Sequence, residues 1–458
     1  METNDEPRHV DRLRRATVAA RDLLAPSHAA RWEVFAKASS THHMARNEGS
    51  PPFETLTEET GVAVRTCHGG RFGFAAASGI DKAAARRAVE SALASALPFP
   101  RDPLPPERLL GLATVPPAPP PTPRGWASHA TGELRDALRA RSAGRLAVLR
   151  LELQEGSYSW ILTTGEGFIG AHSGSSCSIL VEVGDRDGEG GVWHEWLWLP
   201  DPEQFAAEEA AASVVDRALL RGPAGEPRSG VRDVLLHSEI SAHLLAELAP
   251  LFVATPGRAD PLASLVDRQG RLASGLLTLV DDRSGAGAPL VAPCDGEGLP
   301  ARPLTLLEEG VPRHRVACFM DAVLCDETPR GGAVRLSYRD APASGLANLT
   351  VAADTALPPA RLLAESERLL YLVRPVGPIE VVAEIDSFRL VASALSVDRG
   401  RVEGWHPVVE LRGSLGSFLR RIEALGTDRR WYQTSCGYVG APSMLIRRQP
   451  VGTGARGG

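Results

Sequence analysis

Eleven of the 26 residues from Pro98 to Pro123 are proline, and this segment restricts the fold of the chain more than any other feature. Proline lacks a backbone N–H donor and fixes φ, so neither a helix nor a central strand persists through such a run. The segment is therefore expected to be a stiff linker or a strap across the surface. It separates the first hundred residues from the rest of the chain.

The first unit, residues 1–100, combines helices with paired strands. Apolar and polar residues alternate over 33–38 and 61–65, as they do in strands with one buried face. The glycine pair at 69–70 follows the second strand and predicts a two-residue hairpin. From Asp81 to Leu97, alanine, valine and leucine recur at i, i+3 and i+4, so a helix there can pack one stripe on the sheet.

The middle unit, residues 101–227, is expected to be an antiparallel sheet followed by a helix. Strand-like segments occur at 157–164, 176–183 and 192–199, and an alanine-rich segment at 203–220 has helical character. The Gly- and Pro-containing run at 221–227 ends this helix and marks the second domain boundary.

The third unit, residues 228–452, is expected to be mostly β. A helix over 238–252 is followed by short apolar segments that alternate with Gly, Pro and Asp turns. Further helices are predicted over 358–370 and 415–425. The fold class is therefore α+β, with an N-terminal mixed α/β domain, a middle antiparallel sheet unit and a C-terminal mostly β domain.

Composition and charge exclude several kinds of partner. The net charge is −6 and the 50 basic residues are scattered, whereas nucleic-acid binding needs a clustered basic face. No apolar run approaches the roughly 20 residues of a membrane span, and the charged N-terminus does not resemble a secretory signal. We therefore expect a cytoplasmic protein that binds neither nucleic acid nor membrane. The six cysteines form no CxxC pair, so free thiols are expected.

Two motif-like runs have simpler structural explanations. Gly165–Gly170 matches GxGxxG, but a dinucleotide site needs a helix after the loop, and here another strand follows. A glycine-rich hairpin loop is therefore predicted. His194 and Glu195 begin like HExxH, but Trp198 stands at the second histidine position within a strand-like segment, so no zinc site is expected there.

His237, Glu239 and His243 form another group of potential metal ligands. On a helix, six residues correspond to a rotation of about 240°, so the two histidines would point apart. His243 and Glu247 share a face, but two potential ligands are fewer than the three or four of a zinc site. A metal hydrolase that uses His237, His243 and Glu247 is therefore kept as an alternative.

The remaining signal is a series of short segments in a fixed order. They are Gly61–Arg65 followed by Gly70–Ala75, Leu277–Asp282, Asp295–Ala301, Leu306–Val311, Ser337–Arg339, Asn348–Leu349 and Ser435–Met444. Together, over roughly residues 30–450, they resemble the TldD/TldE (PmbA) family of bacterial metallopeptidases. The segment Ser435–Met444 is similar to the TldE-type terminus.

The resemblance also implies which chemistry belongs to this chain. TldD subunits carry HExxxH on a helix, where two histidines and a downstream cysteine bind zinc and the glutamate is the base. Here Ala246 and Leu251 stand at the two histidine positions, and only Glu247 is kept. Cys436 corresponds to the cysteine region, and with His243 it is the remaining candidate ligand. The resemblance therefore implies no catalytic residue and no zinc in this chain, and zinc in a TldD-like partner.

The function implied by the resemblance is that of a non-catalytic, TldE-like subunit of a heterodimeric zinc metallopeptidase. Its partners would be a TldD-like catalytic chain and a flexible peptide substrate. An extended peptide can add to a sheet edge through main-chain hydrogen bonds, without demands on its sequence. A stand-alone peptide-binding or scaffold protein is the second alternative.

Overall fold

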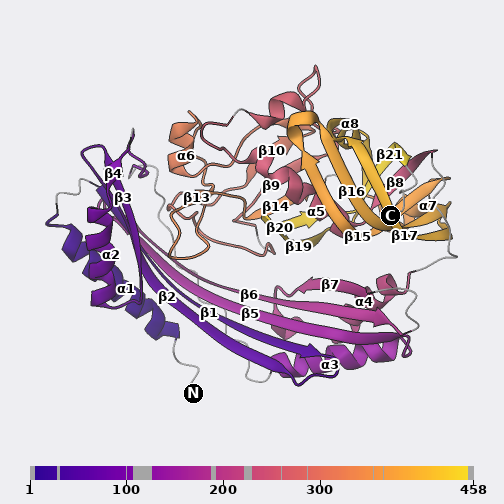
Figure 1. Cartoon of the computed structure of the whole chain (residues 1–458), viewed down its shortest axis with the longest axis horizontal. Helices are drawn as coiled ribbons and strands as arrows, with labels where there is room; N and C mark the ends of the chain where they lie inside the picture. The colour runs from indigo at the N-terminus through magenta and orange to yellow at the C-terminus, as the bar shows by residue number, and fades with distance from the viewer. Residues whose placement is uncertain are drawn as a thin grey trace, which may run out of the picture.

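The structure is a computed structural model, and it describes residues 6–27, 31–99, 101–106, 126–186, 192–220, 230–258, 260–285, 287–353, 355–364 and 366–451. Most of the proline-rich segment and the boundary expected at 221–227 lie outside these residues. Within them, helices and several large sheets confirm the α+β class (Figure 1).

The first sheet is long, antiparallel and curved, and it runs along one side of the molecule (Figure 1). Its strand order is β4-β3-β2-β1-β5-β6-β7. The strands are β1 (Arg31–Asn47), β2 (Phe53–His68), β3 (Arg71–Ser78), β4 (Leu97–Pro98), β5 (Leu146–Thr164), β6 (Ile169–Asp185) and β7 (Val192–Trp198). Gly69 and Gly70, both with positive φ, connect β2 to β3, and the GxGxxG run connects β5 to β6. Both hairpin predictions are confirmed.

This sheet does not stop at residue 100. Strand β1 pairs with β2 along one edge and with β5 along the other, so strands from both sides of the proline-rich segment share hydrogen bonds. The expected middle unit is therefore not a sheet of its own. Alternation along a strand reveals which face is buried but not which strand lies alongside, so the sequence pattern could not show this continuity.

Four helices lie on this sheet, namely α1 (Glu6–Leu24), α2 (Lys82–Ala94), α3 (Trp126–Arg141) and α4 (Ala207–Ala218). Helices α1 and α2 share a hydrophobic cluster with one end of the sheet. Helices α3 and α4 share another cluster with β5–β7 and with part of the C-terminal half. Helix α2 begins where Asp81 accepts a hydrogen bond from the Ala84 backbone at 2.7 Å, which is an ordinary N-cap.

The C-terminal half encloses one helix, α5 (Ser238–Leu248), between two six-stranded sheets. One sheet has the order β17-β16-β15-β8-β21-β18, with β8 (Gly230–Leu236), β15 (Leu369–Val382), β16 (Ser387–Asp398), β17 (Arg401–Ser414), β18 (Ile422–Leu425) and β21 (Met444–Val451). The other has the order β11-β10-β9-β14-β20-β19, with β9 (Thr278–Asp281), β10 (Leu304–Glu308), β11 (Val311–Pro312), β14 (Asn348–Ala352), β19 (Arg430–Thr434) and β20 (Gly437–Ala441).

The smaller elements are α6 (Phe319–Leu324), α7 (Pro359–Ala364), α8 (Leu415–Arg420), β12 (Ala333–Val334), β13 (Ala343–Ser344), and the 3-10 turns η2 (Pro202–Gln204), η3 (Ala249–Phe252), η4 (Pro261–Ser264) and η5 (Ala383–Ile385). The helices predicted over 358–370 and 415–425 are therefore too long. The second part of each is a strand. Leu369 and Leu370 are buried on opposite faces of β15, and a strand covered on both faces has no alternation that distinguishes it from a helix.

A buried network of four charges joins the first sheet to the C-terminal half. Glu33 and Arg65 come from β1 and β2, whereas Glu297 and Arg335 come from loops of the C-terminal half. Arg65 donates to Glu33 at 3.0 Å and to Glu297 at 2.8 Å, and Arg335 contacts Glu33. Each side chain is at most 3% exposed. Burial alone would raise the pKa of Glu33, but Arg335 and Arg65 hold it below its ordinary value.

Beside this charge network, Tyr338 packs its ring over Gly61 of β2. A Cβ at Gly61 would lie 2.1 Å from the ring, so no larger residue fits without displacing Tyr338. Lys37 donates to the Leu336 carbonyl at 2.6 Å, and Arg335 stacks over Phe35 at 4.6 Å from its centroid. The segment around Tyr338 is therefore docked on the first sheet by apolar and charged contacts together.

Replacing Arg65 by Met should destabilise the protein by about 3–5 kcal/mol, because Glu297 would lose its arginine partner and Glu33 would lose one of its two. The measurement is urea denaturation. The matched control is Arg399→Met, whose partner Glu367 is 72% exposed, and it should leave the midpoint unchanged. Equal effects of the two substitutions would contradict a structural role for the buried network.

Candidate functional site

Helix α5 carries the residues that the sequence resemblance compares with HExxxH, and its N-terminus is fixed by His237. The Glu239 backbone N–H donates to His237 Nδ1 at 3.1 Å, so this histidine is the N-cap. Glu239 lies in the first turn, where a carboxylate is stabilised by the helix dipole. The helix ends at Leu248, and Pro250 stands in the 3-10 turn that follows.

Most of the α5 surface is apolar and buried, because both C-terminal sheets pack against it. Ala246 is 3% exposed and Leu251, in the following turn, is 6% exposed, and both belong to the hydrophobic cluster around the helix. The two positions that the sequence resemblance compares with the histidines of HExxxH are thus occupied by carbon side chains in a packed core. They offer no atom that can bind a metal ion.

His243 and Glu247 form the half-buried stripe of α5, as their four-residue spacing predicts. Cys436 lies in the turn between β19 and β20, with its Sγ 3.4 Å from the Thr434 hydroxyl. Burial raises the pKa of the Cys436 thiol, and the carboxylates of Asp281 and Glu247 raise it further.

His237 lies apart from this stripe and is 8% exposed. Burial lowers its pKa well below the ordinary value, and the charges of Arg217 and Arg430 lower it further. Among the residues that the structure describes, no group of three or more His, Cys, Asp or Glu side chains is arranged to hold a metal ion. His237, His243 and Glu247 are thus not brought together as a metal site, and the side chains of Ala246 and Leu251 do not fit a zinc ion.

A buried ion-pair chain at the N-terminal end of α5 was not predicted from the sequence. Arg217 of α4 contacts Glu195 of β7 and Glu239 of α5, each at 2.6 Å. Its guanidinium also lies over the Trp193 ring, 4.8 Å from the centroid. Arg430 of β19 approaches Glu195 at 3.7 Å. These ion pairs connect the first sheet and α4 to the C-terminal half.

Two tyrosines complete this polar region. Ser238 shares a 2.8 Å hydrogen bond with the Tyr432 hydroxyl, and the Tyr371 ring lies 6.3 Å from His237. Burial raises the pKa of Tyr371 to about 12, so the phenol is neutral at physiological pH. The contacts give these groups a structural role.

The sequence does contain a signal for the buried ion-pair chain. Glu195 alternates with Trp193, and β7 has the burial pattern of a strand with inward-facing residues at these two positions. A carboxylate on the apolar face of a strand needs a buried cation, which indicates an arginine from elsewhere in the chain. Nothing in the local pattern identifies Arg217 as that cation.

The helices among the described residues all fall short of the length and apolar content that a bilayer crossing requires. The fold is similar to that of several solved structures. TldE from Thermococcus kodakarensis superposes with a TM-score of 0.84 at 15% identity, over 94% of this chain and 99% of the other. A Thermotoga maritima protein, described as a candidate modulator of DNA gyrase, gives 0.77 at 16% identity over 95% and 99%.

A Bacteroides thetaiotaomicron protein with the same description gives a TM-score of 0.74 at 15% identity, over 99% and 100% of the two chains. At such identities the likeness defines the fold: the α+β architecture of TldE. Two sequence models agree with it, the PmbA/TldA metallopeptidase domain 1 over residues 53–96 and the C-terminal domain over residues 229–453. The chain therefore belongs to the PmbA/TldD metallopeptidase family. No curated protein sequence matches it.

The pKa of His237 predicts a pH dependence of stability. Because its folded pKa lies below the unfolded value of about 6.5, the unfolded chain takes up the proton first, and the free energy of unfolding falls as the pH drops below that value. His237→Asn keeps an N-cap acceptor but removes this titration. Urea denaturation at about pH 7.5 and about pH 5.5 should therefore show a smaller stability loss in the variant.

The control for this measurement is His194→Asn, because His194 is an exposed histidine on the neighbouring strand β7. It should retain the pH dependence of the parent chain. An unchanged pH dependence in His237→Asn would contradict the assignment of His237 as a buried, neutral cap.

Proposed function

We propose that this chain is the non-catalytic, TldE-like subunit of a two-chain zinc metallopeptidase that acts on flexible peptides in the cytoplasm. Zinc and the catalytic base would belong to a TldD-like partner. The observation that carries this proposal is the burial of Ala246 and Leu251 in the core around α5, at the positions of the motif histidines.

The completeness of the fold supports the same proposal. The match covers 99% of the TldE chain, so the absence of histidines at positions 246 and 251 is not accompanied by the absence of a domain of that fold. Glu247 keeps the glutamate of the motif, but Ala246 and Leu251 cannot hold the zinc ion that would bind a water for it. A carboxylate without such a water has no nucleophile to activate. A subunit of this kind contributes by assembling the complex and by contacting the peptide.

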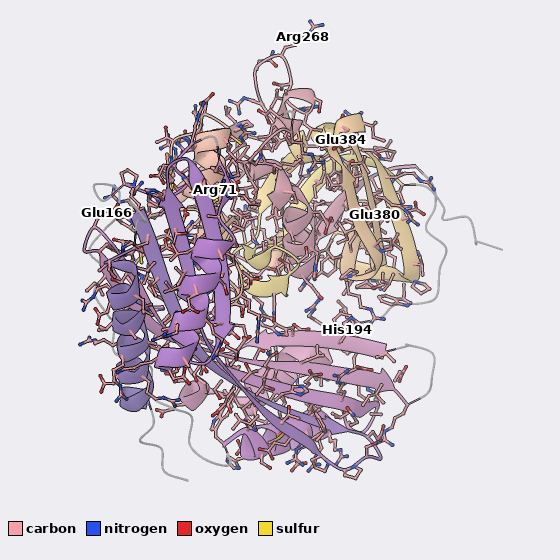
Figure 2. The ribbon with its side chains drawn as sticks, turned by 60° about the vertical axis from the view of Figure 1, so that its left-hand side comes forward. Arg71, Glu166, His194, Arg268, Glu380 and Glu384 are labelled. Atoms are coloured by element: carbon pink, nitrogen blue, oxygen red, sulfur yellow. The ribbon has the colours of Figure 1, made fainter. Side chains whose placement is uncertain are left out.

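The strands β15–β17 offer a surface for such assembly. Four aliphatic side chains on this segment are exposed: Val376 by 40%, Val382 by 45%, Ile385 by 71% and Val408 by 59%. Glu380 and Glu384 lie on the same segment, away from the first sheet (Figure 2). Exposed apolar groups rimmed by charges are typical of protein–protein interfaces, so we assign the partner contact to this segment.

Reconstitution with the TldD-like chain of the same host tests the proposal. Peptidase activity on an unfolded peptide should require both chains, and Glu247→Gln should leave it intact because this carboxylate contacts no zinc-bound water. The double variant Ile385→Asp/Val408→Asp should abolish co-elution of the two chains, since it places charges in the apolar contact. Size-exclusion chromatography with light scattering and a fluorescent peptide assay provide the measurements.

The matched control is Leu97→Asp/Ile169→Asp, which changes two exposed aliphatic residues of the first sheet, 69% and 61% exposed, and should leave assembly unchanged. A drop of about a thousandfold in activity with Glu247→Gln, the size expected for loss of a general base, would contradict the non-catalytic role. A chain that binds peptide but no TldD-like protein would instead support the stand-alone peptide-binding alternative.

A further inference from the structure

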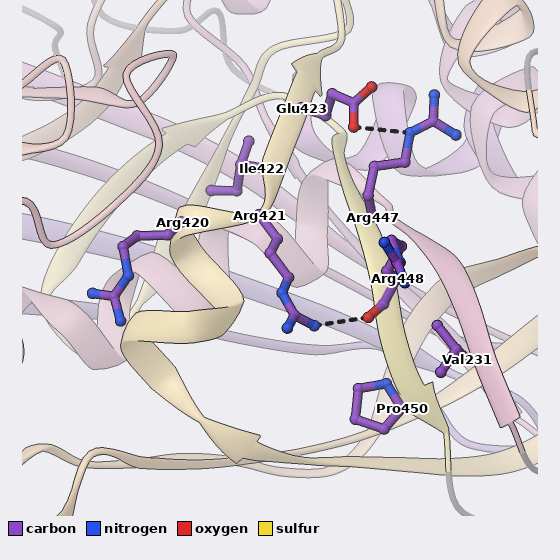
Figure 3. Close-up of a pocket in the computed structure, with 8 residues that line it drawn as sticks. All are labelled: Val231, Arg420, Arg421, Ile422, Glu423, Arg447, Arg448 and Pro450. Atoms are coloured by element: carbon purple, nitrogen blue, oxygen red, sulfur yellow. Dashed lines mark hydrogen bonds and ion pairs between the residues drawn. The ribbon is translucent and has the colours of Figure 1, made fainter. Parts of the chain in front are cut away.

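A hollow of about 710 Å³ opens at the edge of the C-terminal sheet, and its lining includes none of Ala246, Glu247, Leu251 and Cys436. Its lining comes from β8, β18, β21 and the residues before β18 (Figure 3). The lining residues are Val231, Arg420, Arg421, Ile422, Glu423, Arg447, Arg448 and Pro450. We call this feature the arginine hollow, because four of its eight lining residues are arginines.

Three of these arginines have no carboxylate partner among the described residues. Arg420 donates to two backbone carbonyls, those of Leu265 at 3.2 Å and Arg271 at 3.3 Å. Arg421 donates to the Arg448 carbonyl at 2.8 Å, as Figure 3 shows. Neutral carbonyls leave each positive charge uncompensated. Arg448 is exposed, so its guanidinium N–H groups are open to solvent.

The one acidic residue of the lining does not neutralise these charges. Glu423 is paired with Arg447 at 3.2 Å (Figure 3). The same guanidinium also contacts Asp233 at 2.5 Å. Arg447 and its two carboxylates therefore form a closed group. The arginine hollow keeps an excess of positive charge within a chain whose net charge is −6.

Like charges held close together repel, and an anion placed between them removes the repulsion. A guanidinium presents five N–H donors in a planar fork that matches the oxygens of a carboxylate or a phosphoryl group. Val231, Ile422 and Pro450 supply apolar surface between the cations. The combination favours a ligand with several anionic oxygens on a small carbon body, and the volume is in the range of small-molecule sites.

We propose that the arginine hollow binds a small multivalent oxyanion, with Arg421 and Arg448 as its main ligands and Arg420 at its rim. Phosphoryl and polycarboxylate compounds share the required chemistry. This site is separate from the residues aligned with the zinc motif, and the proposal does not depend on the proposed peptidase role.

Isothermal titration of the full chain with pyrophosphate and, separately, with citrate at low ionic strength tests the proposal. At least one anion should bind saturably at one site per chain. Arg421→Gln/Arg448→Asn should weaken this binding about tenfold or more, because charge-assisted hydrogen bonds are lost. Asn is chosen because Arg448 has a φ of 53°, in the left-handed region that Asn tolerates. The anion that binds more tightly identifies the source as phosphoryl or polycarboxylate.

The control variant Arg302→Gln/Arg368→Gln removes the same total charge from two exposed arginines elsewhere and should keep the parent affinity. Circular dichroism verifies that both double variants are folded. Absence of saturable binding for both anions would overturn the proposal. An equal loss of affinity in the two double variants would overturn it as well, since that result would reflect net charge rather than a site.

Discussion

The buried network of Glu33, Arg65, Glu297 and Arg335 is the interaction on which the arrangement of the two halves depends. Its members come from two strands of the first sheet and two loops of the C-terminal half, and none reaches solvent. An unpaired buried charge costs several kcal/mol. The arrangement of the two halves that brings all four charged groups together is therefore the most stable one. Beside this network, Tyr338 packs on Gly61, so steric contact as well as charge pairing determines how the two halves fit together.

At the other end of the interface, the ion pairs of Arg217 with Glu195 and Glu239 also join the first sheet to the C-terminal half. Helix α5 is therefore held in a fixed position between these elements. Inside this frame the helix is packed with aliphatic side chains, including Ala246 and Leu251, the two positions that the sequence resemblance compares with the motif histidines. A single substitution would not restore a zinc site, because a histidine at position 246 or 251 would have to displace core packing. In the proposed assembly, the catalytic residues therefore belong to the partner, and this chain contributes a folded subunit with a contact surface.

Much of the local structure could be predicted from the sequence. The hairpin at Gly69 follows from turn preferences and the helix after Asp81 from apolar periodicity, and both are present. Pairings between distant segments could not be predicted. That β1 lies beside β5, or that Arg65 meets Glu297, depends on tertiary contacts with no local signature. The candidate site shows the same division: substitution of the motif histidines is visible in the sequence, whereas the burial of Ala246 and Leu251 required the structure.

The zinc content of the purified protein decides whether this chain holds a metal centre. The purified chain, incubated with excess zinc and then dialysed, should hold well under one zinc ion per molecule by elemental analysis, because two of the three expected ligand positions are Ala246 and Leu251. One equivalent of zinc that survives dialysis, and that disappears in His243→Ala or Cys436→Ser, would contradict the account and assign a metal centre to this chain.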